Sequence, residues 1–362
     1  MVTIRAGTCT ATFAFEVGQS IDLDQCERLL STTVRQTIRP SRRAPAHFSY
    51  RPAALRLTQA AGEQFLGTRG CTSVHLVLYD FGAAAVGFTF PLAGATLAAL
   101  IPLSDQLYGN QDLQTAARQR IESLLATVRP AVTRPRLAEV VEDYVVFELE
   151  SVTPAVDTES LLRDQGSTLA QVLRGELTSL STQEIGDALA GTLSVSPTDL
   201  AIVDWNAAVL LDPDPEEARL VLEFANVQLL ELRWLDAELD AALEEAYDRL
   251  TQRRRGGLAG VRLHTPDLDR IGELQADAAI LFERVSNALK LVGDQYLSRL
   301  YRLVSGRLHL ADWDAGIVRK LDTLEGIYGK LNDRATARRL EVLEWIVILL
   351  IAFEIVLSLV QG

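Results

Sequence analysis

The feature that most constrains this chain is an apolar run at residues 342–360, which reads VLEWIVILLIAFEIVLSLV. Its 19 residues contain no proline, glycine or basic side chain. A helix of that length spans about 28 Å, close to the hydrocarbon thickness of a bilayer. The run therefore predicts a single C-terminal transmembrane helix. The alternative is a C-terminal helix that is buried in a large hydrophobic interface.

Basic side chains set the expected orientation of this run. Arg334, Arg338 and Arg339 lie just before it, and no charged residue follows it. Because positively charged flanks stay on the cytoplasmic side, we expect a single-pass, tail-anchored protein in the cytoplasmic (inner) membrane, with residues 1–341 in the cytoplasm. The first twenty residues lack a secretory apolar core, which argues against export.

Acidic residues interrupt the run. Glu344 lies near its start, and Glu354 lies ten residues deeper. A carboxylate at that depth costs roughly 2.5 to 3.5 kcal/mol on insertion scales. We therefore expect Glu354 to lie in a contact between helices, and we predict that Leu343, Glu344, Trp345 and Glu354 form the anchor and the oligomer contact.

The composition limits what the remaining residues can bind. The formal net charge of the 362 residues is −13, which disfavours broad nucleic-acid binding because phosphate neutralisation needs a basic face. The 3 cysteines and 4 histidines are scattered without metal-ligand spacing. No phosphate-binding, hydrolase or zinc-protease motif is present. The sequence therefore predicts no catalytic residue, cofactor, metal or small-molecule ligand. Its arginine and alanine bias is typical of a bacterial source.

Residues 1–155 alternate strand-like and helix-like segments, which predicts an α+β domain with a mixed or antiparallel sheet. Predicted strands cover residues 8–15, 74–79, 83–90 and 140–149, and predicted helices cover 22–37 and 113–128. The two middle strands are expected to form a hairpin. Adjacent acids such as Glu142 and Asp143 are interpreted as solvated surface, because a chain with 48 acidic residues places many together by chance.

Residues 156–211 are predicted to form a small α/β insert or extension. A short helix begins at Thr182, and short strands cover 200–203 and 207–211. Between these strands lie Asp204, Trp205 and Asn206, which we interpret as a hairpin tip rather than a ligand loop.

Residues 212–341 are predicted to be almost entirely helical, as a long hairpin or coiled coil. The predicted helices cover 216–255 and 267–305, and a third begins near Asp314 and continues into the anchor at 342–360. The first half of the first helix is apolar on several sides and needs burial on more than one. The third helix carries an apolar seam that packs within the chain or, alternatively, mediates self-association. The predicted seam is Ile317, Leu321, Leu324, Tyr328 and Leu331.

A basic stretch stands out within this acidic chain. Residues 35–56 interleave arginines with His47, Phe48 and Tyr50, and no acidic residue intervenes. Such a stretch can pair within the fold, bind RNA or the ribosome, or face lipid heads or a protein partner. The predicted patch residues are Arg39, Arg42, Arg43, Arg51 and Arg56.

Three segments of the chain resemble the family named "required for meiotic nuclear division", a domain of unknown function. The most specific is 319–356, in which a coiled-coil opening is followed by Leu343, Glu344 and Trp345 and by an isoleucine-rich span with Glu354. The other two are 79–86 (YDFGAAAV) and 184–193 (EIGDALAGTL). The chain departs from the family pattern at Asp187, where His is expected, and lacks its Arg-His-Ser before the LEW sequence.

The resemblance implies a membrane-anchored homo-oligomer without an established reaction, whose mitochondrial members are linked to organellar translation. The expected function is thus a tail-anchored scaffold that presents a cytoplasmic domain, with the tethering of translation machinery as a role implied by analogy. One alternative is a membrane-associated enzyme with a site between the α+β domain and residues 156–211, for which converging carboxylates and arginines would be the sign. Another is a regulator that contacts a partner membrane protein through Glu354.

Overall fold

A long strand with alternating side chains organises the sheet of this protein. The computed structural model describes residues 2–33, 39–41, 53–61, 70–255, 276 and 295–329. Strand β1 (Thr3–Glu16) confirms the predicted strand at 8–15. Its threonines at even positions face one side of the sheet, whereas Cys9, Ala11 and Phe13 at odd positions enter the hydrophobic core on the other.

Nine strands form one mixed sheet in the order β3-β4-β5-β6-β1-β8-β11-β10-β9. The neighbours are antiparallel except β8 and β11, which run parallel. Besides β1, the strands are β3 (Arg39–Ser41), β4 (Leu55–Ala60), β5 (Ser73–Leu78), β6 (Ala83–Pro91), β8 (Val141–Thr153), β9 (Thr192–Leu193), β10 (Leu200–Val203) and β11 (Ala207–Leu211). A second, small sheet pairs β2 (Ser20–Ile21) with β7 (Val132–Thr133). Residues 192–211 thus extend the main sheet.

The predicted hairpin is confirmed as β5 and β6. Its turn needs a glycine, because Gly82 has a φ of 104° and a Cβ there would lie 1.8 Å from the carbonyl oxygen of Gly18. The second predicted hairpin, β10 and β11, is also confirmed, with Leu200 opposite Leu211.

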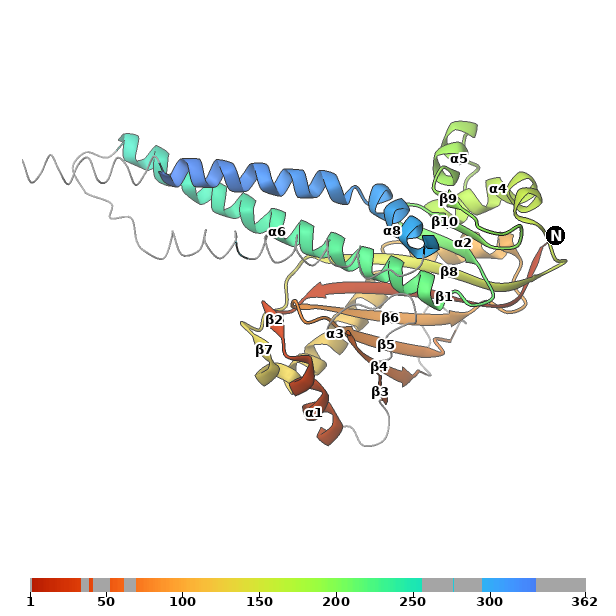
Figure 1. The fold of residues 1–362 in the computed structure, drawn as a ribbon, viewed down its shortest axis with the longest axis horizontal. Helices are drawn as coiled ribbons and strands as arrows, with labels where there is room; N and C mark the ends of the chain where they lie inside the picture. Colours follow the sequence, from red (N-terminus) through yellow and green to blue (C-terminus); the bar gives the residue numbers. More distant parts are fainter. Residues whose placement is uncertain are drawn as a thin grey trace, which may run out of the picture. The chain divides into compact units, whose positions relative to one another are not determined.

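Helices cover both faces of this sheet (Figure 1). On the face of the hydrophobic core lie α1 (Leu23–Thr33), α2 (Leu100–Leu107), α3 (Gln111–Val128) and α4 (Thr158–Arg174), followed by α5 (Thr182–Leu189) at the β10 end. Short 3-10 turns occupy Leu97–Ala99 and Arg129–Ala131. The crossover through α4 and α5 lets β11 return parallel to β8.

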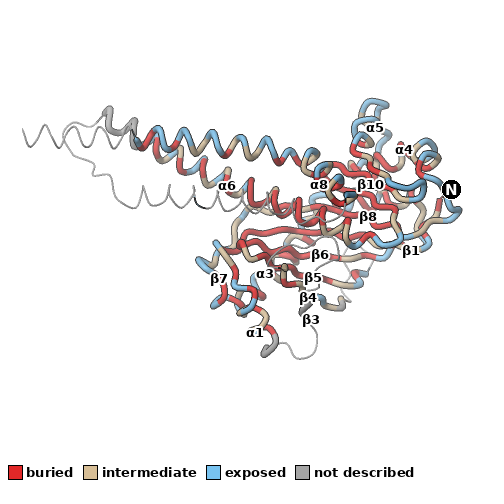
Figure 2. The backbone as a smooth tube through the Cα atoms, in the orientation of Figure 1, coloured by how far each residue is buried: buried red, intermediate tan, exposed pale blue. Residues whose placement is uncertain are grey.

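The first half of α6 (Glu216–Arg255) lies on the opposite face, and the bounds of this helix match the prediction. Every residue from 221 to 228 is buried, as Figure 2 shows by its continuous red. This confirms that the apolar half of α6 is covered on more than one side. One neighbour is α8 (Gln295–Arg307), whose Tyr301 hydroxyl donates to the side-chain oxygen of Gln228.

The chain divides into two compact units, Met1–Trp234 with Glu283–Trp313, and Leu235–Phe282 with Asp314–Gly362. In the second unit the described residues are the rest of α6, residue 276 and the helical residues 314–329. Lys320 Nζ lies 2.6 Å from Asp236 Oδ1 and 2.6 Å from Asp240 Oδ1, which joins this helix to α6. The seam residues Ile317, Leu324 and Tyr328 are buried, and Leu321 is partly buried.

Several predictions lie outside the described residues. They concern the anchor at 342–360, Leu331 of the seam, most of the predicted helix at 267–305, and Arg42, Arg43 and Arg51 of the basic patch. Across the described ranges no helix is both long enough and apolar enough to cross a membrane.

Candidate functional site

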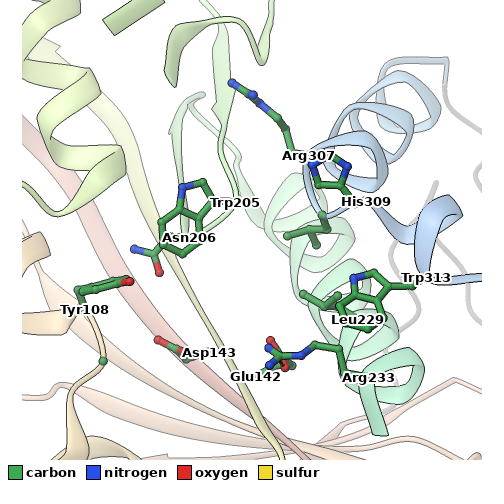
Figure 3. A pocket seen from close by; sticks show the side chains of 12 residues that line it. Tyr108, Glu142, Asp143, Trp205, Asn206, Leu229, Arg233, Arg307, His309 and Trp313 are labelled. Carbon is green, nitrogen blue, oxygen red and sulfur yellow. Dashed lines mark ion pairs between the residues drawn. The ribbon is translucent and has the colours of Figure 1, made fainter. Parts of the chain in front are cut away.

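A pocket with a volume of about 400 Å³ opens at the N-terminal end of β8, next to the start of β11 (Figure 3). The two parallel strands pair from Ala207 opposite Val145 onward, so β11 leaves the first residues of β8 uncovered on that side. The residues that line the pocket come from five places in the fold. They are Tyr108 and Gly109 after α2, Glu142 and Asp143 of β8, Trp205 and Asn206 of the β10–β11 turn, Leu229 and Arg233 of α6, and Arg307, Leu308, His309 and Trp313 at and after the end of α8.

Glu142 and Asp143 point to opposite faces of β8 because adjacent strand residues alternate, and both line the pocket. Glu142 is only 6% exposed and forms an ion pair with Arg233. Burial raises the pKa of Glu142 to about 7, with a contribution from Asp143, and Arg233 opposes this rise. The interpretation of these acids as solvated surface is therefore wrong, because the start of α6 covers this end of β8.

Among the described residues, Asp143 forms no ion pair and the side-chain amide of Asn206 forms no hydrogen bond. Burial raises the pKa of Asp143, and no described cation lies within ion-pair distance of its carboxylate. Asn206 is 5% exposed. Its main-chain oxygen accepts a hydrogen bond from Val145 N at 3.2 Å, whereas its side-chain amide has no partner in the described part of the chain.

Two aromatic rings lie next to these polar groups. The Tyr108 and Trp205 rings meet edge to face, with centroids 5.9 Å apart and an angle of 85° between their planes. Tyr108 is 49% exposed and Trp205 44%, an unusual exposure for such large rings. The predicted hairpin tip at Trp205 is thus also one wall of the pocket.

A buried carboxylate fixes the turn that carries Trp205 and Asn206. Asp204 is 1% exposed, and its Oδ2 lies 3.0 Å from Nε of Arg174. Its Oδ1 accepts a hydrogen bond from Trp205 N at 2.9 Å, and its main-chain oxygen accepts one from the Tyr144 hydroxyl at 2.8 Å. Burial raises the pKa of Asp204, and Arg174 opposes this rise.

Arg307 ties the end of α8 to the same turn. Its Nε donates to Val203 O at 3.3 Å, and its Nη2 donates to Asp187 O. Its guanidinium also faces the carboxylates of Asp204 and Asp187, at 3.9 Å and 3.7 Å. At the rim, the ring of His309 lies 3.0 Å from Asp312 Oδ2 and is exposed. The geometry of the pocket is therefore held by ion pairs on three of its walls.

A second polar cluster lies beneath α6 and is largely buried. Glu223 is 2% exposed and meets Arg56 at 3.0 Å, the His75 ring at 3.3 Å, and Arg219. Arg219 also meets Glu148 at 3.0 Å. Every charge here has a partner, and the cluster lines no described pocket, so its role is structural.

Two arginines of the predicted basic patch are described, and one of them, Arg56, belongs to this cluster. Arg39 lies in β3, and Arg56 pairs with Glu223 within the fold. For the other three arginines the patch stays a prediction. Among the described residues no group of three His, Cys, Asp or Glu side chains is placed to hold a metal ion.

The pocket lies between residues 1–155 and 156–211, where the enzyme alternative placed its site, and carboxylates and arginines line it; the sequence did not identify which residues would form it. Glu142, Asp143, Trp205 and Asn206 were each considered separately, and nothing in the sequence places 142–143 beside 205–206. The available signal was the combination of two adjacent acids at a strand end with a polar and aromatic turn between two short strands.

The matches to known proteins lie in the part of the chain that forms the main sheet. Residues 6–217 match the family described as "Uncharacterized protein MJ0711, N-terminal domain". The chain is 26% identical over 209 residues to "Uncharacterized protein MJ0711" of Methanocaldococcus jannaschii. The aligned residues make up 57% of this chain and 63% of that protein. No solved structure was found to match. Because the family match covers more than half of the chain, the protein belongs to the family of the MJ0711 N-terminal domain.

Proposed function

We propose that the protein is a membrane-anchored homo-oligomeric scaffold whose sheet domain presents a binding surface on the cytoplasmic side. The observation that carries this proposal is the apolar run at 342–360, preceded by three arginines. The proposed partner is the translation machinery. This choice of partner rests on the resemblance of residues 319–356 to the "required for meiotic nuclear division" family. That segment lies outside the family match at residues 6–217.

The described helices bear on where self-association would occur. Ile317, Leu324 and Tyr328 of the seam are already buried in a single chain, and Lys320 holds that helix to α6. A stripe that is covered within the chain has little surface left for a second copy. We therefore assign the oligomer contact to the anchor itself, around Glu354, where a carboxylate in lipid gains most from a partner helix.

Membrane attachment is tested by alkaline carbonate extraction of membranes from cells that produce the full chain. We expect the intact protein to stay in the membrane pellet and a variant without residues 342–362 to leave it. Ile351→Arg places a charge in the run and is expected to weaken attachment, whereas the matched control Ile351→Leu keeps it. Complete extraction of the intact protein would overturn the anchor.

The pocket favours a second candidate function, an enzyme. The observation that supports an enzyme is Glu142, a buried carboxyl with a pKa of about 7 next to Asp143 and Arg233. A general acid or base works best when its pKa lies near the working pH. Purified full-length protein would be incubated with a metabolite extract and the products followed by mass spectrometry. Turnover by the wild type but not by Glu142→Gln supports catalysis, and equal turnover by both counts against it.

A further inference from the structure

We propose that the pocket binds a small molecule through an organic cation, a primary ammonium or a guanidinium, held by the Asp143 carboxylate beside the rings of Tyr108 and Trp205. The proposal concerns the ligand class and does not depend on the membrane anchor or on catalysis.

The charges of the pocket select the sign of the ligand. Its basic side chains already face carboxylates: Arg233 meets Glu142, Arg307 meets Asp204, and His309 meets Asp312. Asp143 has no such partner among the described residues. Asp143 is therefore a carboxylate of the pocket without an ion pair among the described residues, and an anionic ligand would have to approach it in a partly buried site.

The exposed rings add to the same preference. A cation over the face of a tryptophan or tyrosine is stabilised by about 0.5–1 kcal/mol at exposed sites, and by more when water is excluded. Tyr108 and Trp205 stand edge to face at the side of the pocket where Asp143 lies (Figure 3). A ligand against this ring pair would cover apolar surface that the protein otherwise leaves in water.

Asn206 provides the directional contact. Asn206 is 5% exposed as a residue, and its side-chain amide has no hydrogen-bond partner in the described part of the chain. The amide oxygen can accept a hydrogen bond from an ammonium or guanidinium. A cavity of about 400 Å³ has the size of a small-molecule site.

The test is a titration of the full-length protein in detergent with butylammonium and butylguanidinium, followed by tryptophan fluorescence and calorimetry. We expect saturable binding of at least one cation. Asp143→Asn and Trp205→Leu should each weaken it by at least about tenfold, or 1.4 kcal/mol. Glu150→Gln removes an exposed charge from the same strand and should change nothing. The uncharged isostere butanol should not bind.

Two results would overturn the proposal. One is the absence of saturable binding of either cation up to about 10 mM, and the other is a preference for butyrate over butylammonium. If Asp143→Asn does not fold, as judged by circular dichroism, Trp205→Leu still decides the question because its side chain is half exposed. A protein that stays in the membrane pellet yet binds no cation would leave the scaffold proposal standing and remove this one alone.

Discussion

At the scale of single residues, Glu142 makes the stability of the protein depend on pH. Burial raises its pKa from 4.5 to about 7, so between these values the folded state binds more protons than the unfolded state. Its contribution to stability is therefore present at low pH and is lost as pH rises through about 7. At about 1.4 kcal/mol per pH unit, the loss approaches about 3 kcal/mol.

We expect Glu142→Gln to remove this loss of stability at rising pH. The free energy of unfolding of the variant, relative to the wild type, should increase by up to about 3 kcal/mol between pH 4.5 and pH 8. Denaturant unfolding of both proteins across this range measures it. Glu150→Gln on the exposed side of β8 is the control. A difference that does not vary with pH would show that Glu142 ionises normally.

The pKa of Glu223 is shifted in the opposite direction from that of Glu142. Burial alone would raise its pKa, but Arg219 and Arg56 outweigh burial and hold that pKa well below its usual range. Glu223→Gln should destabilise the protein by about 3–5 kcal/mol, because it leaves the partly buried Arg56 without its carboxylate and Arg219 with Glu148 alone. Denaturant unfolding of the variant at neutral pH provides the measurement.

The matched control for this prediction is Glu244→Gln on the same helix. Glu244 is exposed, so the change should stay within about 0.5 kcal/mol. A loss below about 1 kcal/mol in Glu223→Gln would mean that the cluster beneath α6 tolerates an unpaired charge.

Residue types alone do not reveal which charges are buried. Arg56 belongs to a basic stretch, and Glu142 to an acidic pair, and both patterns are typical of solvated surface. Their burial is decided by α6, which begins at Glu216 and lies across the sheet far from either residue in sequence. A pattern read over a few neighbours cannot include a helix that arrives later in the chain.

At the scale of elements, β5 and β6 pack closely where Gly87 of β6 lies against the ring of His75 of β5. A Cβ on Gly87 would lie 2.1 Å from Nε2 of His75, and that ring is held by Glu223 at 3.3 Å. The ring cannot move away without breaking this contact. Gly87→Ala should therefore destabilise the protein by about 1–3 kcal/mol, as overpacking does, which thermal unfolding would detect.

Gly186→Ala is the matched control for this substitution. A Cβ on Gly186 meets no atom within 4 Å, and alanine favours the helix α5 by up to about 1 kcal/mol relative to glycine. The control should thus be neutral or stabilising. Equal effects of the two substitutions would show that His75 moves freely.

Periodicity predicted most elements but not their order in space. It placed β1, the β5–β6 and β10–β11 hairpins and α6 correctly, because each has a clear period and clear ends. It missed α4, whose centre contains Gly166, a residue that weakens helical propensity. The structure gives the reason for this glycine: a Cβ there would lie 3.1 Å from Leu189 of α5.

At the scale of the whole molecule, the pocket arises from pairings that no local pattern contains. The parallel register of β8 with β11 brings residues 142–143 beside 205–206, and α6 and α8 add Arg233 and Arg307. A parallel pair needs a long crossover, so its register depends on the packing of α4 and α5 rather than on the two strands alone. The site could therefore be predicted only as separate pieces.

The proposed anchor offers the opposite case, a segment whose amino-acid sequence alone predicts an assembly. Glu354 lies ten residues into the run after Glu344, at a depth where an ionised carboxylate costs roughly 2.5 to 3.5 kcal/mol unless another helix satisfies it. We expect Glu354→Leu to lower the mass of the detergent-purified oligomer, measured by mass photometry. Glu354→Gln keeps the hydrogen-bonding capacity and should preserve the oligomer. An unchanged mass in Glu354→Leu would assign Glu354 to a partner membrane protein or to no contact at all, and the copurifying proteins would separate these outcomes.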